Sequence, residues 1–332
     1  MGKAEYLLKR VRRMDSAAMI DTARRISRHT GKAVSTVLCD MVYCGAKYLA
    51  GYVDYETFRL YEMTPEKRKT VITRGVNNRY CRMLNQPSYV KLMDNKVVFN
   101  RLFEKQLGRR WIDLRAATEA EFSAFFREIP DAVAKPLEGS CGNGVIPIAY
   151  RNSEQASEIY WCLRENRQYL VEEKIRQHTE LEALYPDAVN TLRFVTIRKN
   201  GRTQIVFACL RIGRGGSVVD NFNRGGLLAA ISKEGILHGP AIDKQGNLYC
   251  NHPNTFIKID GFQVPMFSSV CRYVERLAGI VPEIGYTGWD IAITAYGPVV
   301  VEGNPFPGHD LYQPRLFQGN GLRPLFESIM NS

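Results

Sequence analysis

The sequence predicts an α+β protein in which a helical N-terminal region precedes a domain of mixed strands and helices. Hydrophobic residues such as Met19, Ala23 and Ile26 recur at helical spacing in the N-terminal part of the chain. Strand-like runs separated by turns begin only after residue 94. Hydrophobic residues make up 45% and charged residues 24% of the 332-residue chain, which is typical of a folded globular protein. We therefore expect two regions, 1–93 and 94–332.

The expected elements follow from local signals. Gly31 is expected to end the first helix, and Thr64 followed by Pro65 predicts another helix start. The other expected helices cover residues 34–48, 97–107, 119–128, 153–165 and 265–278. The expected strands cover residues 131–135, 145–150, 169–172, 192–198, 203–211, 289–294 and 299–302.

Positive charge is concentrated in the N-terminal region. The chain has 45 basic and 34 acidic residues, a formal net charge of +11, and residues 1–93 hold 18 of the basic and 8 of the acidic residues. Such a region has an anionic partner or is simply a solvated helical surface. The partner we expect is an anionic membrane surface facing residues 1–32, or an acidic substrate. Nucleic acid is not expected, because the residues that suggest chemistry lie outside this region.

The sequence predicts a cytoplasmic protein, or one that is peripheral at the inner face of the membrane. It lacks a run of about 18 uncharged apolar residues, and the nearest candidate, residues 33–53, is interrupted by Asp40 and Lys47. The N-terminus does not have the hydrophobic segment of a signal peptide. The eight cysteines form neither a C-x-x-C pair nor a zinc-like spacing, which favours reduced thiols.

A glycine-rich segment follows the expected strand that ends at Lys135. Its members are Gly139, Ser140, Gly142 and Gly144, and a second strand comes directly after them. Glycines without Cβ allow backbone N–H groups to approach phosphate oxygens closely. The segment is therefore either a phosphate-binding loop or a flexible hairpin with a surface lysine. It is neither a Walker loop nor a Rossmann turn, because both of those lead into a helix.

Three side chains with oxygen ligands fall on two neighbouring strands late in the chain. A tight turn between these strands would place Asp290 beside Glu302, with Asn304 two residues further along the same face. Such a set suits Mg²⁺, a hard cation that prefers oxygen ligands. The alternative is a hairpin with surface carboxylates, although an unpaired charge inside an apolar strand is costly.

Arginines on and after the middle strands add positive charge. Arg193 lies in one expected strand, Arg211 ends the next, and Arg224 follows Asn221 in a segment that leads to two glycines. Guanidinium groups beside a phosphate loop hold phosphate charge or a developing oxyanion. Taken alone, each of them is more often a surface residue.

In this order the motifs resemble those of the ATP-grasp superfamily over roughly residues 90–310. Lys96 resembles the first ATP-binding lysine of that superfamily and Lys135 the second. The segment 171–175 is similar to the hinge whose backbone binds adenine, and its candidate residues are Glu172, Glu173, Lys174 and Ile175. The resemblance leaves open which carboxylate contacts the ribose, and the candidates are Glu172, Glu173 and Glu180.

Other segments narrow the resemblance within the superfamily. Residues 221–226, which read Asn-Phe-Asn-Arg-Gly-Gly, look like the branch that includes ribosomal-protein glutamate ligases. The helical front end is most similar to the subgroup of sugar-transfer-associated ATP-grasp proteins. ATP-grasp ligases usually begin with a small α/β domain instead, so the resemblance says little about the acceptor.

The resemblance implies two α+β lobes that sandwich ATP. The first lobe, residues 94–171, carries the glycine-rich loop, and the second, residues 172–332, carries the metal site. It implies that Asp290, Glu302 and Asn304 bind Mg²⁺, with Mn²⁺ as a substitute.

The activity implied is that of an ATP-dependent carboxylate–amine ligase, which forms an acylphosphate and releases ADP and phosphate. Arg211 is assigned to the γ-phosphate, and Arg193 or Arg224 to the carboxylate or oxyanion. The expected substrates are an amine and a carboxylate that is small or linked to a lipid or nucleotide, such as a sugar acid, an amino acid or a cell-envelope polysaccharide precursor. The alternatives are a phosphotransferase acting on a hydroxyl and, with less support, a non-enzymatic polyanion-binding module.

Overall fold

The computed structural model describes residues 15–129, 131–139, 142–149, 154–317 and 319–331. Contacts within the chain divide it into two compact units, which are described separately. The first unit is Met1–Met83 with Gly308–Ser332, and the second unit is Leu84–Pro307. The division expected from the sequence, with its boundary after residue 93, differs from this one and stays a prediction.

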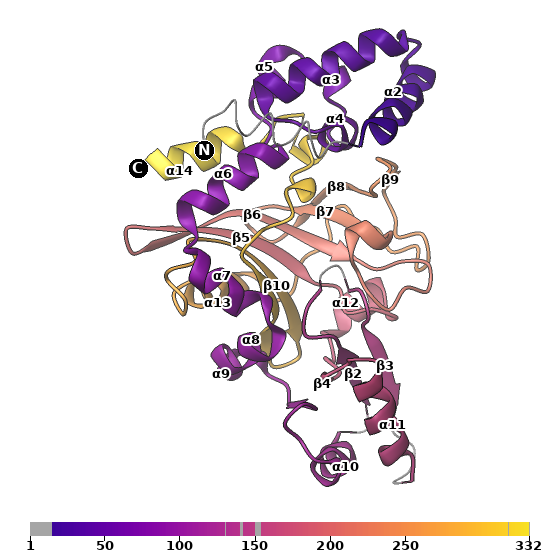
Figure 1. Cartoon of the computed structure of the whole chain (residues 1–332), viewed down its shortest axis with the longest axis vertical. Helices are drawn as coiled ribbons and strands as arrows, with labels where there is room; N and C mark the ends of the chain where they lie inside the picture. The colour runs from indigo at the N-terminus through magenta and orange to yellow at the C-terminus, as the bar shows by residue number, and fades with distance from the viewer. Residues whose placement is uncertain (1–14, 130, 140–141, 150–153, 318, 332) are drawn as a thin grey trace. The chain divides into compact units, whose positions relative to one another are not determined.

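The described part of the first unit is helical (Figure 1). Its elements are α2 (Ser16–Thr30), α3 (Val34–Tyr48), α4 (Tyr52–Thr57), η1 (Leu60–Glu62), α5 (Pro65–Lys69), α6 (Arg74–Leu84), η3 (His309–Leu311), η4 (Pro314–Phe317) and α14 (Arg323–Asn331). Met19, Ala23 and Ile26 of α2 are buried, as their spacing predicts. Gly31 ends α2 in the left-handed conformation and Thr64 caps α5, which confirms both of these signals.

The C-terminal segment belongs to the first unit because its side chains pack there. His309 forms a buried contact with Asp54, with 2.7 Å between Nε2 and Oδ1. Phe326 is fully buried, and its ring lies 6.0 Å from the ring of Tyr80 and 5.5 Å from that of Tyr312. The contacts of His309 with Asp54 and of Phe326 with Tyr80 join positions more than 200 residues apart, which a local sequence pattern does not indicate.

The second unit contains two antiparallel sheets. The four-stranded sheet has the order β1 (Trp111–Asp113), β4 (Leu170–Glu173), β2 (Asp131–Lys135), β3 (Ile146–Ala149). The seven-stranded sheet has the order β11 (Gly297–Asn304), β10 (Tyr286–Thr294), β5 (Leu192–Lys199), β6 (Arg202–Ile212), β7 (Leu227–Ile231), β8 (Leu237–Ile242), β9 (Leu248–Tyr249). The strands expected from the sequence are all present, whereas β1, β7, β8 and β9 were not expected.

Helices accompany both sheets, so the unit consists of two α+β lobes. They are α7 (Pro87–Asp94), α8 (Lys96–Leu102), α9 (Glu104–Leu107), α10 (Glu119–Glu128), α11 (Glu154–Glu165), α12 (Thr179–Leu184) and α13 (Phe267–Leu277), with a short turn η2 (Phe222–Arg224). The helix expected over residues 97–107 is interrupted at Phe103, which separates α8 from α9. The helix expected over residues 119–128 is confirmed as α10.

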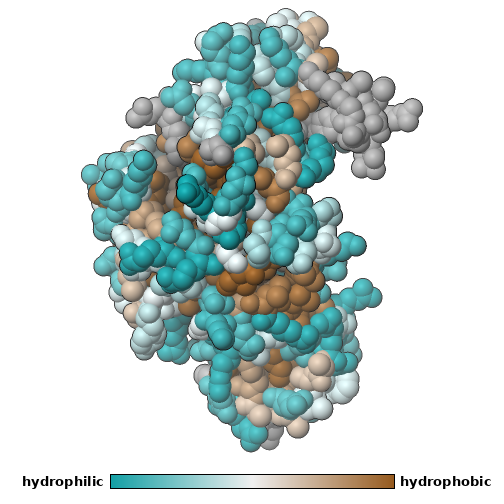
Figure 2. All heavy atoms as spheres, turned by 90° about the vertical axis from the view of Figure 1, so that its left-hand side faces the viewer, coloured by the Kyte–Doolittle hydropathy of each residue, from teal (hydrophilic) through white to brown (hydrophobic). Residues whose placement is uncertain are grey.

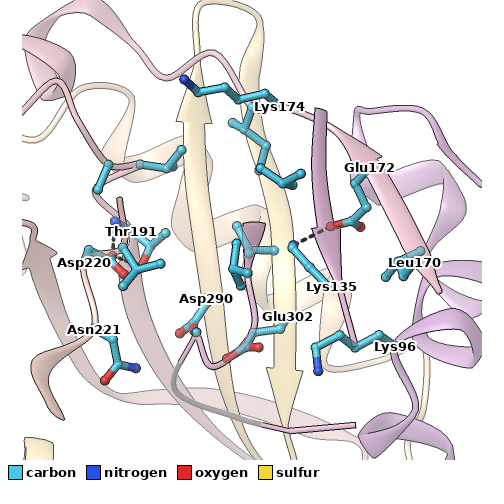
Figure 3. A pocket seen from close by; sticks show the side chains of 18 of the residues that line it. Lys96, Lys135, Leu170, Glu172, Lys174, Thr191, Asp220, Asn221, Asp290 and Glu302 are labelled. Atoms are coloured by element: carbon cyan, nitrogen blue, oxygen red, sulfur yellow. Dashed lines mark hydrogen bonds and ion pairs between the residues drawn. The ribbon is translucent and has the colours of Figure 1, made fainter. Parts of the chain in front are cut away.

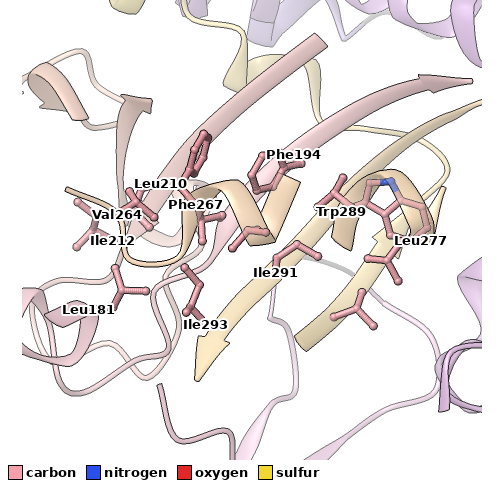
Figure 4. Packing of buried hydrophobic residues seen from close by; sticks show 14 of the residues in the cluster. Leu181, Phe194, Leu210, Ile212, Val264, Phe267, Leu277, Trp289, Ile291 and Ile293 are labelled. Atoms are coloured by element: carbon pink, nitrogen blue, oxygen red, sulfur yellow. The ribbon is translucent and has the colours of Figure 1, made fainter. Parts of the chain in front are cut away.

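The main hydrophobic core packs α13 against one face of the seven-stranded sheet (Figure 4). Phe194 of β5 and Trp289 and Ile291 of β10 point into this core. Successive side chains of a strand point to opposite faces. Arg193 and Asp290, which alternate with these core residues, therefore face the other side of the sheet.

One face of the surface carries a hydrophobic patch surrounded by hydrophilic side chains (Figure 2). Within the described residues, no helix has the length and apolar character needed to cross a bilayer. Of the segment 1–32 that we expect to face a membrane, residues 1–14 lie outside the described part of the chain.

Candidate functional site

A cavity of about 1030 Å³ lies in the second unit, where the two sheets and α8 contribute its walls (Figure 3). The expected site residues that line it are Lys96, Lys135, Gly139, Gly142, Glu172, Glu173, Lys174, Ile175, Arg211, Asn221, Asp290, Glu302 and Asn304. Gly144, Glu180, Arg193 and Arg224 are not part of the lining, and Ser140 lies outside the described residues. The size suits a ligand of cofactor dimensions.

Lys96 enters the cavity from the first turn of α8. Asn95 caps this helix, because its side chain accepts hydrogen bonds from the backbone N–H groups of Val97 and Val98. The ammonium of Lys96 donates to the carbonyl of Gly139 at 2.9 Å. Burial, together with the charge of Lys135, lowers the pKa of Lys96, while the nearby acids oppose the change. This lysine is therefore placed to exchange a carbonyl partner for an anionic ligand.

Lys135 stands at the end of β2 and pairs with Glu172 of the neighbouring strand β4. Glu172 also accepts hydrogen bonds from Asn100 and Arg109, both at 2.8 Å. Burial alone would raise the pKa of Glu172, but the charges of Arg109 and Lys135 outweigh it and hold the pKa well below its usual range. The carboxylate is thus ionised and shared between two cations.

The glycine-rich segment connects two paired strands, as expected. β2 and β3 are antiparallel, and Gly139, Gly142 and Gly144 have φ values of 119°, 68° and 72°. These conformations favour glycine over residues with a Cβ. At Gly142 a Cβ would also lie 3.1 Å from the side chain of Val219, so the loop approaches the opposite wall closely there.

The expected hinge leaves β4 and passes along the cavity. Glu173, Lys174 and Ile175 line it, whereas Glu180 is exposed in the first turn of α12 and does not. Glu182, two residues further in the same first turn of α12, does line the cavity. The sequence spacing did not single out Glu182.

The hairpin β10–β11 brings the expected metal ligands together. Asp290 and Glu302 are direct cross-strand partners, and the amide of Asn304 donates to Glu302 Oε1 at 3.0 Å. Burial and the adjacent Glu302 raise the pKa of Asp290 to about 7, although Arg193 and Arg211 partly offset this. The guanidinium groups of Arg193 and Arg211 thus offset part of the negative charge that the two carboxyl groups place side by side.

The donor chemistry of this hairpin fits a hard divalent cation. Asp290 Oδ1 is buried, and no hydrogen bond of good geometry reaches it from the described residues, although Arg193 Nε is 2.5 Å away. The described chain holds no cluster of three His, Cys, Asp or Glu side chains suited to a metal. The expected site differs from such a cluster because it combines two carboxylates with an amide, an oxygen set that Mg²⁺ accepts.

Two of the expected arginines support Asp290 from the sheet. Arg193 is buried and its Nη2 donates to Asp290 Oδ2 at 3.1 Å, and Arg211 Nη2 is 2.8 Å from the same oxygen. Thr191 accepts a hydrogen bond from Arg211 at 2.7 Å and donates to Asp220 at 2.5 Å, so that these two residues orient the Arg211 guanidinium.

The third arginine, Arg224, lies outside the cavity lining. Arg224 donates to the carbonyl of Gly142 at 2.8 Å and therefore contacts the glycine-rich segment. Asn221 lines the cavity and its side chain caps η2. Arg224 follows that cap in the same short turn.

The family of the chain follows from comparison with known proteins. The model of the family described as "Sugar-transfer associated ATP-grasp" matches residues 75–331, well over half of the chain. The chain belongs to the sugar-transfer-associated ATP-grasp family. This confirms the resemblance and the ATP-grasp fold expected from the sequence.

Solved structures similar to this sugar-transfer-associated ATP-grasp chain have low identity. D-alanyl-alanine synthetase A from Vibrio cholerae is 13% identical with a TM-score of 0.43, and the match covers 72% of this chain and 64% of that one. N5-carboxyaminoimidazole synthetase from Staphylococcus aureus, in a complex with ADP, is 12% identical with a TM-score of 0.42, and the match covers 66% of this chain and 46% of that one.

A third structure is the ATP-grasp ligase PsnB, complexed with a phosphomimetic variant of its minimal precursor, Mg and ADP. It is 15% identical with a TM-score of 0.43, and the match covers 77% of this chain and 65% of that one. The chain thus spans less than two thirds of the length of each of these three proteins. No curated protein sequence matches it significantly. At these scores the likenesses carry no argument about chemistry.

Three side chains that line the cavity of this ATP-grasp chain and contact expected site residues were not expected from the sequence. Arg109, Thr191 and Asp220 line the cavity, and each holds an expected site residue. Arg109 is 63 positions from its partner Glu172. A sequence pattern carries no signal for pairs this distant, so only the fold reveals them.

Proposed function

We propose that this protein is an ATP-dependent ligase that forms an amide from a carboxylate and an amine, with release of ADP and phosphate. One observation carries the proposal. In a chain of the sugar-transfer-associated ATP-grasp family, Lys96 and Lys135 line the same cavity as Asp290, Glu302 and Asn304. The sequence resemblance assigns the first group to phosphates and the second to a metal ion, and the fold gives them one shared space.

The nucleotide is held between the two lobes. The ammonium groups of Lys96 and Lys135 pair with its phosphates, and the backbone after Glu173 binds adenine. Asp290, Glu302 and Asn304 hold Mg²⁺, with Mn²⁺ as a substitute. When bound, this ion neutralises charge on the transferred phosphoryl group.

The residues of the cavity orient the two steps of the reaction. In the first step a substrate carboxylate oxygen attacks the γ-phosphorus, and the bond to the bridging oxygen breaks with ADP as leaving group. In the second, the amine attacks the acylphosphate carbonyl, phosphate leaves and the amine loses a proton. Arg211 supports the phosphoryl group, and the walls exclude water that would hydrolyse the acylphosphate.

The substrates we propose are a carboxylate from a sugar acid, an amino acid or a cell-envelope polysaccharide precursor, and a partner amine. The basic region 1–32 supports a lipid- or nucleotide-linked carboxylate, or contact with the anionic inner surface of a membrane, because such partners complement its charge. The same proposal places the protein in the cytoplasm or at that surface.

Product analysis tests the reaction class. The purified chain is incubated with Mg·ATP and panels of carboxylates and amines, and nucleotide products are separated by chromatography. We expect ADP and phosphate, and their release stops when EDTA removes the metal. Formation of AMP and pyrophosphate would contradict an acylphosphate route.

A phosphotransferase is the second candidate, and a specific observation favours it. Arg193 pairs with Asp290 and Arg224 donates to the carbonyl of Gly142, so both arginines expected to bind a substrate carboxylate already have partners in the chain. A hydroxyl acceptor needs no such partner. A phosphorylated product that is stable and forms without any amine would select this candidate over the ligase.

A further inference from the structure

We propose that Glu172 is a positioning residue that holds Lys135 for the nucleotide, and that Arg109 anchors Glu172 to the strand that carries Glu302. This inference rests on the proposed function, because it states what Glu172 does for a nucleotide-binding lysine. The family resemblance leaves Glu172 among the candidate ribose ligands. Its contacts in the structure assign it a different role.

Both carboxylate oxygens of Glu172 are already engaged. Oε1 accepts from Asn100 Nδ2 and from Arg109 Nη2, each at 2.8 Å, and Oε2 pairs with the ammonium of Lys135. The Glu172 side chain is 1% exposed, whereas the Lys135 side chain is 14% exposed and reaches the cavity. A ribose hydroxyl would have to reach the one acceptor position left on Oε2, beside the Lys135 ammonium, on a side chain that is almost wholly buried. A phosphate oxygen can instead bind the more exposed Lys135 ammonium directly.

Arg109 connects this carboxylate to the other sheet. Its Nη1 donates to the carbonyl of Val300 in β11 at 2.7 Å and to that of Leu107 at 3.2 Å, while Nη2 faces Glu172 of β4. The side chain is 3% exposed. A planar guanidinium serves several acceptors at once in fixed directions, which a lysine does not. Arg109 and Glu172 thereby connect Lys135 to β11, the strand that carries the proposed metal ligand Glu302.

The chain offers matched controls next to Arg109 and next to Glu172. Arg110 follows Arg109 but pairs with Glu128, where both side chains are about 60% exposed. Glu173 follows Glu172 and accepts from the backbone N–H of Arg110 at 3.2 Å. Changes at Arg110 and Glu173 alter the same charges one position away without touching the network.

The first experiment measures coupling in the protein without nucleotide. Urea unfolding of Glu172→Gln, Lys135→Met and the double variant gives the interaction between the two side chains. We expect a coupling of about tenfold in the unfolding equilibrium constant, because neighbouring charged groups interact by this order. For the control pair, Glu173→Gln and Lys135→Met, the coupling in the unfolding equilibrium constant should be less than about twofold. A coupling below twofold for Glu172 would overturn the inference, whatever the nucleotide does.

The second experiment measures Mg·ADP binding by calorimetry in the same variants. If Glu172 acts through Lys135, Glu172→Gln weakens binding about tenfold in the wild-type background and less than about twofold beside Lys135→Met. Equal losses in both backgrounds would mean that Glu172 contacts the nucleotide itself and would overturn the inference. The probe 2′-deoxy-ADP separates the two roles. If Glu172 bound the ribose hydroxyl, Glu172→Gln would no longer weaken the binding of a nucleotide that lacks this hydroxyl.

Arg109→Lys keeps the test decisive if Glu172→Gln fails to fold. The substitution keeps the positive charge but removes the planar guanidinium, so we expect Mg·ADP to bind about tenfold more weakly. This loss of affinity should disappear when Lys135→Met is also present. The control Arg110→Lys should bind Mg·ADP as the wild type does. Loss of affinity in both backgrounds would contradict the anchoring role. A wild-type chain that binds no adenine nucleotide would instead overturn the proposed function, and the nucleotide-free coupling would then decide the role of Glu172.

Discussion

At the scale of single residues, the site is built from side chains that serve two neighbours at once. Asp290 faces Glu302 across the hairpin and is also paired with Arg193 and Arg211. Glu172 similarly joins Lys135 to Arg109. Such shared groups make the consequences of a substitution depend on which partner is left without its counter-charge.

Glu302→Gln tests the metal assignment. We expect ADP release to fall by at least about 100-fold, because even the partners of metal ligands cost 10- to 100-fold when changed. The fold should be preserved, since the amide keeps the shape of the side chain. Chromatographic measurement of ADP, with circular dichroism as a check of folding, gives the result. Glu275→Gln, on the exposed side of α13, is the control, and turnover of Glu302→Gln at the control level would contradict the assignment.

A second residue-scale prediction concerns Asp40 in the first unit. Asp40 accepts from Arg68 at 2.6 and 2.7 Å and from the hydroxyl of Tyr55 at 2.6 Å. Burial opposes ionisation, but these hydrogen bonds outweigh it and lower the pKa of Asp40 from 3.8. The contribution to stability is therefore complete above that value and is lost as pH falls through the lowered pKa.

Asp40→Asn should accordingly lower the free energy of unfolding by about 1–2 kcal/mol at neutral pH, a value reduced by the partial exposure of the pair. It should also flatten the dependence of stability on pH in the acid range. Denaturant titrations at neutral pH and below the ordinary aspartate pKa measure both effects. An acid dependence identical to that of the wild type would refute this role for Asp40.

At the scale of elements, the loop that joins β6 to β7 folds back on itself. The backbone N–H of Gly226 donates to the carbonyl of Asn221 at 3.0 Å, and a Cβ on Gly226 would lie 2.2 Å from the carbonyl oxygen of Asp220. Only glycine permits this approach. Asp220 in turn receives hydrogen bonds from Thr191, which orients Arg211.

Gly226→Ala should therefore displace Asp220, lower the free energy of unfolding by about 1–3 kcal/mol and reduce ADP release. Gly201→Ala is the control, because no atom lies within 4 Å of a Cβ there and only its positive φ adds a cost. Thermal unfolding and ADP assays of both variants provide the comparison. Equal effects of the two changes would show that the close contact at Gly226 is unimportant.

The elements also show what the sequence can and cannot predict. The hairpin β10–β11 was predicted because its residues alternate around a tight turn, and the same alternation places Asp290 beside Glu302. β7 was not, because Leu227–Ile231 is a short, wholly apolar run that fits a buried helix equally well. β8 contains a glycine and a proline, which argue against a strand, and its pairing with β7 and β9 overrides them.

At the scale of the whole chain, two units defined by their own contacts should respond separately to core mutations. Phe326 is fully buried in the first unit and lies far along the sequence from the helices it contacts. Phe326→Ala should destabilise that unit by about 3–5 kcal/mol, the usual cost of removing a buried aromatic ring. Hydrogen exchange should then rise in α3 and α6 while the strands β10 and β11 stay protected. Equal acceleration in both units would show that they unfold together.

The β10–β11 hairpin, which carries the proposed metal ligands, ends in an exposed turn. The proposed ligands Asp290 and Glu302 lie several residues away from the turn. Tyr296, in the turn itself, is 99% exposed, and the last cross-strand pair before the turn is Thr294 with Gly297. A short epitope or a fluorescent-protein tether inserted after Tyr296 would project into solvent from a rigid two-stranded support. Tyr296 is thus an attachment point for immobilisation at the end of the hairpin opposite to the proposed metal ligands.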